Sequence, residues 1–586
     1  MTDPRTRILV ALAVVGLTLL SYLVFPGRTW LQADTQIYAP ILERLWDPAV
    51  LANDPVAQRP HVAFTIYDEL ALALRRFTGL PFHAILTAQQ LLFRALGVFG
   101  VYMIGTALGL SLRGALLMAA AFSLGATVVG PSVLTLEYEP VPRGFAGPLV
   151  LLALGLAGHG RDLGAGIAAT LAFLYHPPTA AAFWAVYFVL ALWPSPPPVM
   201  TRRIAGLLPL ALGAVLLLLL SRLQPGISEP QMLFDRLDPE LERLQRWRAS
   251  YNWISLWDAA WLRQHVFLWL VSLAAFWRLR RAGAFRTRQP GAWPVIDLEF
   301  FLLGLPLAGL LCVPLSYWLL DHMKWAMIAQ LQPARNLMYL MVLSAVLAVA
   351  AAAKAGEQKR WWESLLWLVV VYAIPAHMRL LQFSAAAFNT PLARQRVLVV
   401  LGLAACAALA LHARTRTAVT GALTAAAAVA PFFVIPHLGN VQNYPRLHHK
   451  ELDQLAAWAR ANTATSSVFL FPDAGRELFP GIFRAKALRA VYVDWKGGGQ
   501  VNFLRGFARE WWERWQRTME GGFRLARLPV YEACGANYLV LRRPRSLPGR
   551  TPAYQNERYV VYALRPRPET PPPPGATALK PGRPGA

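Results

Sequence analysis

Residues 335–353 read RNLMYLMVLSAVLAVAAAA, with one charged residue at the start and none after it. A run of this length and composition can cross the hydrocarbon core of a bilayer as one helix. Similar runs recur along the chain, which is 56% hydrophobic and 15% charged and has a positive mean hydropathy. A soluble protein carries about 25% charged residues, so the sequence predicts a mainly α-helical, polytopic membrane protein.

About thirteen such segments are predicted to span the membrane as a helical bundle. The fifth and sixth are short, and His176-Pro177-Pro178 separates them, so this pair is a candidate for a partly re-entrant hairpin. The first segment follows a basic start and is interpreted as a retained helix, with a cleaved signal peptide as the alternative. The predicted segments are 8–25, 84–110, 114–131, 143–158, 163–176, 178–194, 203–221, 264–279, 297–316, 335–353, 362–376, 396–412 and 418–437.

The basic residues orient these segments. The formal net charge is +25, but only seven of the 57 basic residues are lysine, and many arginines flank apolar runs. This is the pattern of the positive-inside rule, and it argues against nucleic acid as a partner. The basic loops place the N-terminus in the cytoplasm; they include Arg202-Arg203, Arg278, Arg280, Arg281, Arg286, Arg288, Lys354–Arg360 and Arg414-Arg416. The regions predicted outside are 26–83, 132–142, 222–263, 317–334 and everything after about 438.

The composition changes after Pro436, and three parts are predicted: a membrane domain (1–437), a small extramembrane α/β domain (438–565) and a disordered proline-rich tail (566–586). Within the second part, helices are expected at 452–461 and 503–518. Strands are expected at 467–471, 490–494, 537–541 and 559–564. The outside loop 222–263 mixes acidic residues with tryptophans and is typical of an amphipathic helix at the membrane interface. Cys312, Cys406 and Cys534 are too far apart to suggest a disulfide framework.

The first outside loop carries the leading candidate for chemistry, Asp34, in the stretch LQADTQIY at 31–38. Helical spacing follows this aspartate, so it is either a helix N-cap or a carboxylate that faces a cavity at the bilayer surface. Tyr38, Asn53 and His61 are further polar candidates in this loop. Asp47 and Asp54 each precede a proline, a pattern that favours turns.

The next outside loop holds Glu137-Tyr138-Glu139-Pro140, followed by Arg143. Two carboxylates separated by one residue can chelate a divalent cation, because hard cations take oxygen ligands. Their position between two apolar segments strengthens this interpretation, since ionisable residues near membrane depth are costly and usually functional.

This layout resembles the GT-C superfamily of integral-membrane glycosyltransferases. Asp34 matches the acidic residue of the first outside loop in that superfamily. Glu137 with Glu139 stands where the oligosaccharyltransferase branch has a second acidic pair. The W-W-D motif of that branch is absent, and Trp361-Trp362-Glu363 and Trp511-Trp512-Glu513 only echo it. The segments 34–54, 175–179 and 493–499 look like an uncharacterised bacterial branch.

The resemblance implies an inverting glycosyltransferase of the bacterial inner membrane, with the C-terminal domain on the periplasmic or extracellular side. It would move a sugar from a polyprenyl-phosphate-linked donor to a cell-envelope acceptor. Asp34 would be the general base or a metal ligand. The other implied roles are Mg or Mn ligands for Glu137 and Glu139; donor phosphate contacts for Arg335, Arg143, Lys324 and His176; and acceptor or sugar contacts for Tyr38, Asp54 and Trp495.

Several of these residues also have a purely structural interpretation. Arg335 suits an interfacial anchor, and His176 suits a hydrogen-bonded residue at a helix break. Gly497–Gly499 is interpreted as a flexible turn whose neighbours Asp494, Trp495 and Lys496 are candidates for carbohydrate contacts. Two other classes of protein stay open as alternatives: a transporter or flippase of lipid-linked saccharide, and a noncatalytic envelope assembly protein.

Overall fold

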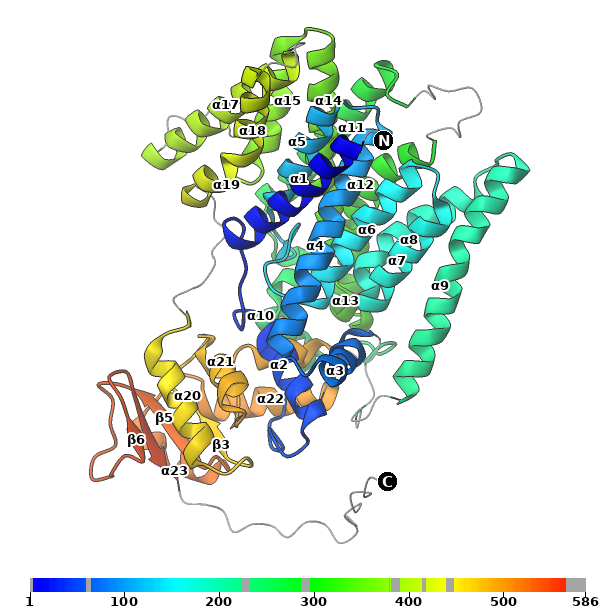
Figure 1. Ribbon diagram of the computed structural model, residues 1–586. Coiled ribbons are helices and arrows are strands. Elements are labelled where there is room, and N and C mark those ends of the chain that lie inside the picture. Colours follow the sequence, from blue (N-terminus) through cyan, green and yellow to red (C-terminus); the bar gives the residue numbers. More distant parts are fainter. Residues whose placement is uncertain are drawn as a thin grey trace, which may run out of the picture.

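The computed structural model (Figure 1) describes residues 4–59, 65–223, 229, 232–285, 296–378, 380, 390–413, 418–438 and 447–564. Within these residues, eight helices are long and apolar enough to cross a membrane, and five shorter apolar helices accompany them. Each predicted segment contains one of these helices, while the exact number of spans stays a prediction. His61, Arg286, Arg288, Arg414-Arg416 and the tail 566–586 lie outside the described residues.

The long spanning helices begin and end close to the predicted positions. Three of them have short neighbouring elements. The helix α12 is followed by η3 (Tyr317–His322), and α14 is preceded by α13 (Ala326–Leu331) and η4 (Pro333–Asn336). The helix α18 is followed by α19 (Pro431–Val434) and η6 (Ile435–His437). The long helices are α1 (Pro4–Leu23), α4 (Phe82–Ala107), α9 (Pro197–Leu223), α11 (Ala259–Arg281), α12 (Ile296–Ser316), α14 (Leu337–Glu357), α17 (Pro391–His412) and α18 (Ala418–Val429).

One predicted segment is shorter than expected. The run 114–131 is helical only to Ser123, because Gly125 adopts a left-handed backbone conformation (φ 65°) that ends the helix. An antiparallel pair of two-residue strands follows, β1 (Thr127–Val128) and β2 (Val133–Leu134). The shorter apolar helices are α5 (Leu112–Ser123), α6 (Pro142–Gly158), α7 (Asp162–Tyr175), α8 (Pro177–Leu192) and α15 (Trp361–Ala373).

Helix α9 stands at the side of the bundle and packs along α7 (Figure 1). The two backbones approach closely at two glycines: a Cβ on Gly166 would lie 2.2 Å from the carbonyl oxygen of Gly206. The opposite face of α9 exposes large apolar side chains, including Leu212 at 72% and Leu219 at 55%. An exposed apolar face on a spanning helix is the surface that lipid covers.

The C-terminal domain is the expected small α/β unit. Its five-stranded sheet has the order β4-β3-β5-β7-β6, with β3 parallel to β4 and β5 and the other pairs antiparallel. The strand β6 was not expected from the sequence. The strands are β3 (Val468–Leu470), β4 (Ala490–Val491), β5 (Tyr538–Arg542), β6 (Tyr554–Gln555) and β7 (Tyr559–Ala563); the helices are α20 (Lys450–Asn462), α21 (Phe479–Ala487), η8 (Gly497–Asn502), α22 (Arg505–Thr518), η9 (Leu525–Arg527) and α23 (Leu528–Ala533).

The C-terminal domain does not stand apart from the rest of the chain. Its hydrophobic core is continuous with apolar side chains from the loops that leave the bundle, such as Ile41, Val56 and Trp253. Figure 1 shows this assembly at the end of the bundle opposite the N-terminus. The loop elements that take part are α2 (Thr35–Trp46), α3 (Tyr67–Thr78), α10 (Pro239–Arg248), η1 (Ser250–Asn252) and η2 (Ile254–Leu256).

The predicted amphipathic helix of the loop 222–263 is α10, but its aromatic neighbours are not all at a lipid interface. Trp253 is fully buried, and Trp247 packs against Trp495 and Trp512 of the C-terminal domain, with ring centroids 5.1 and 5.2 Å apart. The tryptophans therefore join two parts of the chain, because aromatic rings bury a large area where such surfaces meet.

Candidate active site

A cavity of about 580 Å³ lies where the helical bundle meets the C-terminal domain. One wall is apolar and includes Ala214, Leu217 and Leu218 of α9. The lining also carries four cationic side chains and one carboxylate, a net charge of +3 before any neighbour is counted. These charged lining residues are Asp34, Arg143, Arg248, Arg335 and Lys496.

Asp34 faces this cavity and does not act as a helix cap. It stands directly before α2, but its side chain accepts no capping hydrogen bond. Instead, Arg143 Nη1 donates to Oδ2 at 2.5 Å, and Lys496 Nζ donates to Oδ1 at 2.6 Å. Burial raises the pKa of the Asp34 carboxyl, but the charges of Lys496 and Arg143 outweigh it and hold the pKa well below its usual range. The carboxylate is therefore ionised at neutral pH.

The N-terminus of α2 is capped by a residue more than 100 positions away in the sequence. Oε1 of Glu139 accepts from the backbone N–H groups of Gln32 and Ala33 at 2.7 and 2.8 Å, and Oε2 accepts from that of Thr35 at 3.1 Å. A carboxylate is favourable there because the first N–H groups of a helix lack partners and carry partial positive charge. Glu139 thus holds the backbone that presents Asp34.

Replacing Glu139 by alanine is expected to loosen this backbone. Three N–H groups lose their acceptor, and a buried donor without a partner costs about 1–3 kcal/mol. We expect a lower thermal midpoint and faster amide exchange at residues 32–35, together with reduced activity. Glu43→Ala is a matched control, because Glu43 pairs with Arg75 on a more exposed surface. Unchanged exchange at 32–35 in Glu139→Ala would contradict this role.

The acidic pair predicted to bind metal already has protein partners. Glu137 Oε1 accepts from Arg143 Nε at 2.7 Å, while Glu139 serves the backbone of another loop. Within the described ranges there is no group of three or more His, Cys, Asp or Glu side chains that could hold a metal ion. Cations flank Asp34 on both sides, so this donor set does not fit Mg²⁺ or Mn²⁺. No step of the mechanism below uses a metal.

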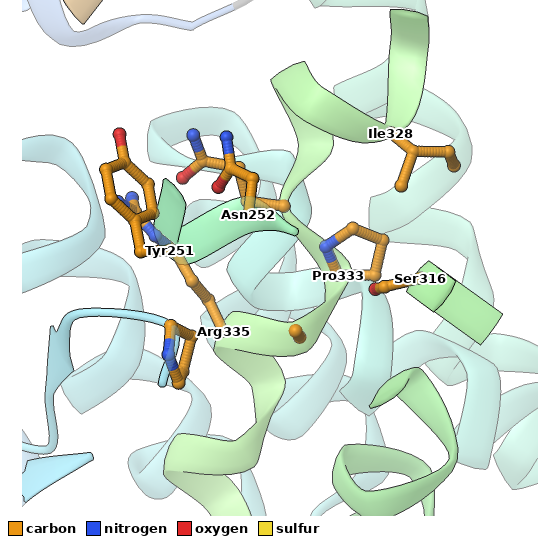
Figure 2. A pocket seen from close by; sticks show the side chains of 9 residues that line it. Tyr251, Asn252, Ser316, Ile328, Pro333 and Arg335 are labelled. Carbon is orange, nitrogen blue, oxygen red and sulfur yellow. The ribbon is translucent and has the colours of Figure 1, made fainter. Parts of the chain in front are cut away.

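Arg335 supplies a cation without a carboxylate partner. Figure 2 shows its side chain reaching toward the ring of Tyr251, and the guanidinium carbon lies 5.5 Å from the ring centroid. Its Nε has no hydrogen-bond partner in the part of the chain that the structure describes, and it forms no ion pair there. Arg335 also lines a second, smaller pocket, drawn in Figure 2, where the hydroxyl of Ser316 has no hydrogen-bond partner among the described residues. A half-buried guanidinium of this kind is suited to bind an anion.

Arg248 is a second cation of this type. Its Nε and Nη2 donate to the backbone oxygen of Trp495 at 3.0 and 2.6 Å, and its guanidinium lies 4.3 Å from the centre of the Trp495 ring. It forms no ion pair with any residue described in the structure. These contacts fix the orientation of the side chain while leaving its charge uncompensated.

Two further predicted residues line the cavity. Tyr38 packs against Tyr67 at a centroid distance of 5.2 Å, and burial together with the charge of Asp34 raises the pKa of its hydroxyl, which stays protonated. His176 caps α8, because its Nδ1 lies 3.2 Å from the backbone nitrogen of Thr179. The structural interpretation of His176 therefore applies, and its ring also borders the cavity.

Three predicted residues lie elsewhere. Lys324 pairs with Glu242 and lies 5.4 Å from the centre of the Trp253 ring, so its charge is already compensated outside the cavity lining. Asp54 is buried in an ion pair with Arg484, as expected for a structural residue rather than for a sugar contact. Trp495 packs among other tryptophans and Arg248 and does not line the cavity.

The sequence did not reveal the roles of Lys496 and Arg248 at the site. Lys496 stood among the candidates for carbohydrate contacts, and its ion pair with Asp34 bridges 462 positions of sequence. Arg248 lay inside the mixed acidic and aromatic loop, where a solvated helix face was the expected structure. Tyr251 and Phe503 also border the cavity without having been assigned a role. Arg248 is the last residue of α10, which also contains Arg243 and Arg246, so no local pattern distinguished it.

The site belongs to a mainly helical protein with apolar helices long enough to cross a membrane, and its cationic cavity lies between these helices and the C-terminal α/β domain. A model for a domain of unknown function, DUF6798, matches residues 450–518, which include Lys496. A search of curated proteins found no match. Among solved structures, this chain is similar to the crystal structure of ArnT from Cupriavidus metallidurans in the apo state. The TM-score is 0.46 at 13% identity, covering 96% of this chain and 98% of that one. At this score and identity, the likeness supports no statement about activity.

Proposed function

We propose that this protein is a membrane glycosyltransferase that moves a sugar from a polyprenyl-phosphate-linked donor to an acceptor hydroxyl in the cavity. The observation that carries the proposal is that one cavity combines an apolar and a cationic lining. Apolar side chains of α9 line it together with Arg335 and Arg248, which have no carboxylate partner among the described residues, and with the ionised carboxylate of Asp34.

This combination suits an amphiphilic anion. The isoprenoid chain of such a donor would lie along Leu217 and Leu218 of α9, which line the cavity. The phosphate would bind the two guanidinium groups, which present forks of donors that match phosphate oxygens. A net charge of +3 on the lining residues favours such an anion over a neutral lipid.

The proposed reaction inverts the anomeric carbon. Asp34 accepts the proton of the acceptor hydroxyl as the hydroxyl oxygen bonds to the anomeric carbon. The bond from that carbon to the phosphate oxygen breaks, and its electron pair leaves with the phosphate. Arg335 and Arg248 stabilise the charge that develops there, an effect that depends on donors already held in place. Arg143 keeps Asp34 oriented through its second ion pair with Glu137.

The test is direct transfer by the full-length protein in lipid nanodiscs. Labelled sugars on polyprenyl phosphate serve as pooled donors, and a native membrane extract supplies acceptors. Release of polyprenyl phosphate together with labelled product supports the proposal. Tight binding of donor without either product, or its movement between leaflets, would instead favour the flippase alternative. A protein that neither binds nor turns over any donor would fit the assembly alternative.

Arg335→Met is expected to weaken donor binding more than it slows the chemical step. A charge-assisted hydrogen bond contributes about 1.5–3 kcal/mol. Since about 1.4 kcal/mol corresponds to a factor of ten, KM for the donor should rise roughly 10- to 100-fold. Steady-state kinetics on donor concentration measures this change. Arg360→Met is the control, because Arg360 is exposed and lies outside the cavity lining. An unchanged KM in Arg335→Met would remove Arg335 from the phosphate site.

A further inference from the structure

The ion pair between Asp34 and Lys496 joins the loop before α2 to the segment between β4 and η8. It takes one oxygen of the proposed base, and Arg143 takes the other. A general base needs a lone pair directed at the proton that it removes. In the arrangement seen here, each oxygen accepts from one cation and keeps a second lone pair. The two cations stabilise the ionised form, so the carboxylate becomes a stronger base when one of them leaves.

The two cations are held very differently. Arg143 lies at the start of α6 and donates through Nε to a second carboxylate, Glu137. Lys496 contacts no carboxylate other than Asp34 among the residues that the structure describes. Its ammonium group is carried on a flexible four-carbon stem. The freedom lies in this side chain, because Gly497–Gly499 begin the 3-10 helix η8 and are not the flexible turn that the sequence suggested. Lys496 is therefore the partner that can leave Asp34 at little cost.

A destination for the ammonium group lies in the same cavity. Lys496, Arg248 and Arg335 all line it, and the two arginines form no ion pair within the described part of the chain. A phosphate held by these arginines brings a larger negative charge than one carboxylate that is already shared with Arg143. A charge-assisted contact to phosphate is therefore the stronger alternative for Lys496.

We propose that Lys496 is an exchangeable counter-ion: it pairs with Asp34 in the free protein and moves to the donor phosphate when the donor binds, which frees Oδ1 of Asp34 from this ion pair. This inference rests on the proposed function. It makes the C-terminal domain part of the active site and couples the strength of the base to the presence of donor. An acceptor or a water molecule alone would meet a carboxylate that two cations still stabilise.

Other charged and titratable groups face Asp34 from the elements packed against it. Tyr38 comes from α2, Arg143 from α6, Arg248 from α10, Arg335 from η4 and Glu139 from the second outside loop. The arginines stay charged and keep their backbone positions, so their electrostatic effect on Asp34 is the same with and without donor. Only the side chain of Lys496 moves in the proposed exchange, so a single variant at this position tests the exchange.

The experiment measures the protonation of Asp34 directly. Infrared difference spectra of the full-length protein in nanodiscs, with Asp34→Asn subtracted, follow the carboxyl band against pH. A synthetic polyprenyl monophosphate is the probe. In wild type we expect the pKa of Asp34 to rise when the probe binds. In Lys496→Met the pKa of Asp34 should be higher than in wild type before the probe binds. It should rise less on binding, because the phosphate then adds its negative charge but no lysine leaves the carboxylate. Probe affinity should fall roughly tenfold with the loss of one contact.

Lys486→Met is the control, because Lys486 pairs with the exposed Asp453 on the same domain and should behave as wild type. Lys496→Arg retains the charge and should restore the low pKa of the free protein. If the pKa of Asp34 rises equally in wild type and Lys496→Met, with the probe bound to both, the exchange of Lys496 is overturned and the proposed function stays intact. Absence of probe binding to wild type would overturn the proposed function itself. Thermal melts exclude misfolding as the cause of either result.

Discussion

Asp34→Asn is expected to reduce sugar transfer roughly 100- to 10,000-fold, the range that a positioned general base contributes. Asparagine has nearly the same shape but cannot take up the proton of the acceptor hydroxyl. Arg143 keeps its pair with Glu137, so the fold around the site should persist. The measurement is single-turnover transfer at saturating donor, which separates the chemical step from binding.

Asp47→Asn provides a matched control for this experiment. Asp47 lies in the same outside loop, is exposed, and accepts a local hydrogen bond from the backbone of Ala49. We expect this variant to keep its activity. Equal turnover in Asp34→Asn and wild type, with unchanged melts, would exclude Asp34 as the base. Because the pKa of Asp34 is well below its usual range, mild acidification of wild type should not reproduce the loss.

Arg484→Met is expected to cause the largest loss of stability. Arg484 Nε donates to Asp54 Oδ2 at 2.7 Å, and Nη2 donates to Asp494; none of these side chains is more than 2% exposed. Removing one partner from a buried ion pair costs about 3–5 kcal/mol, because the remaining charges stay buried without compensation. The effect should appear as faster amide exchange in residues 47–59 and 490–497.

This loss of stability should also reach the active site. Asp494 is two residues from Lys496, and its Oδ2 accepts from the backbone N–H of Gly497 at 3.0 Å. Loosening this segment should therefore weaken the contact with Asp34 and reduce transfer. Lys486→Met, on the same helix α21, breaks only a partly exposed pair, and such pairs contribute about 0–1 kcal/mol. Equal melting temperatures for the two variants would contradict a structural role for the Arg484 network.

Local patterns predicted much of the fold. Each apolar run overlaps a helix. Backbone polar groups in lipid need hydrogen-bond partners within their own segment, so a long apolar run predicts a helix from local sequence alone. The strands β3, β4 and β7 also lie within their predicted ranges, and β5 ends one residue beyond its range. The helix predicted over 114–131 was too long, because the apolar composition continues past Gly125 while its left-handed conformation ends the helix.

The candidate site was predicted less completely. Asp34, Tyr38, Arg143, His176 and Arg335 were named from the sequence, and the structure brings all five to one cavity. The spacing of the acidic pair suggested shared ligation, but Glu137 and Glu139 have different partners in three dimensions. Similarly, the aspartate-proline pattern at residue 54 predicted a turn but did not predict that Asp54 pairs with the distant Arg484.

Local sequence was enough to predict the positions of the apolar helices, the presence of a C-terminal α/β unit and Asp34 as the candidate acid. Each of these depends on residues that are neighbours along the chain. The capping of α2 by Glu139 and the pairing of Lys496 with Asp34 across 462 positions became visible only in three dimensions. Hydrogen bonds and ion pairs act over a few ångströms in space, and a single sequence does not record which distant residues meet at that distance.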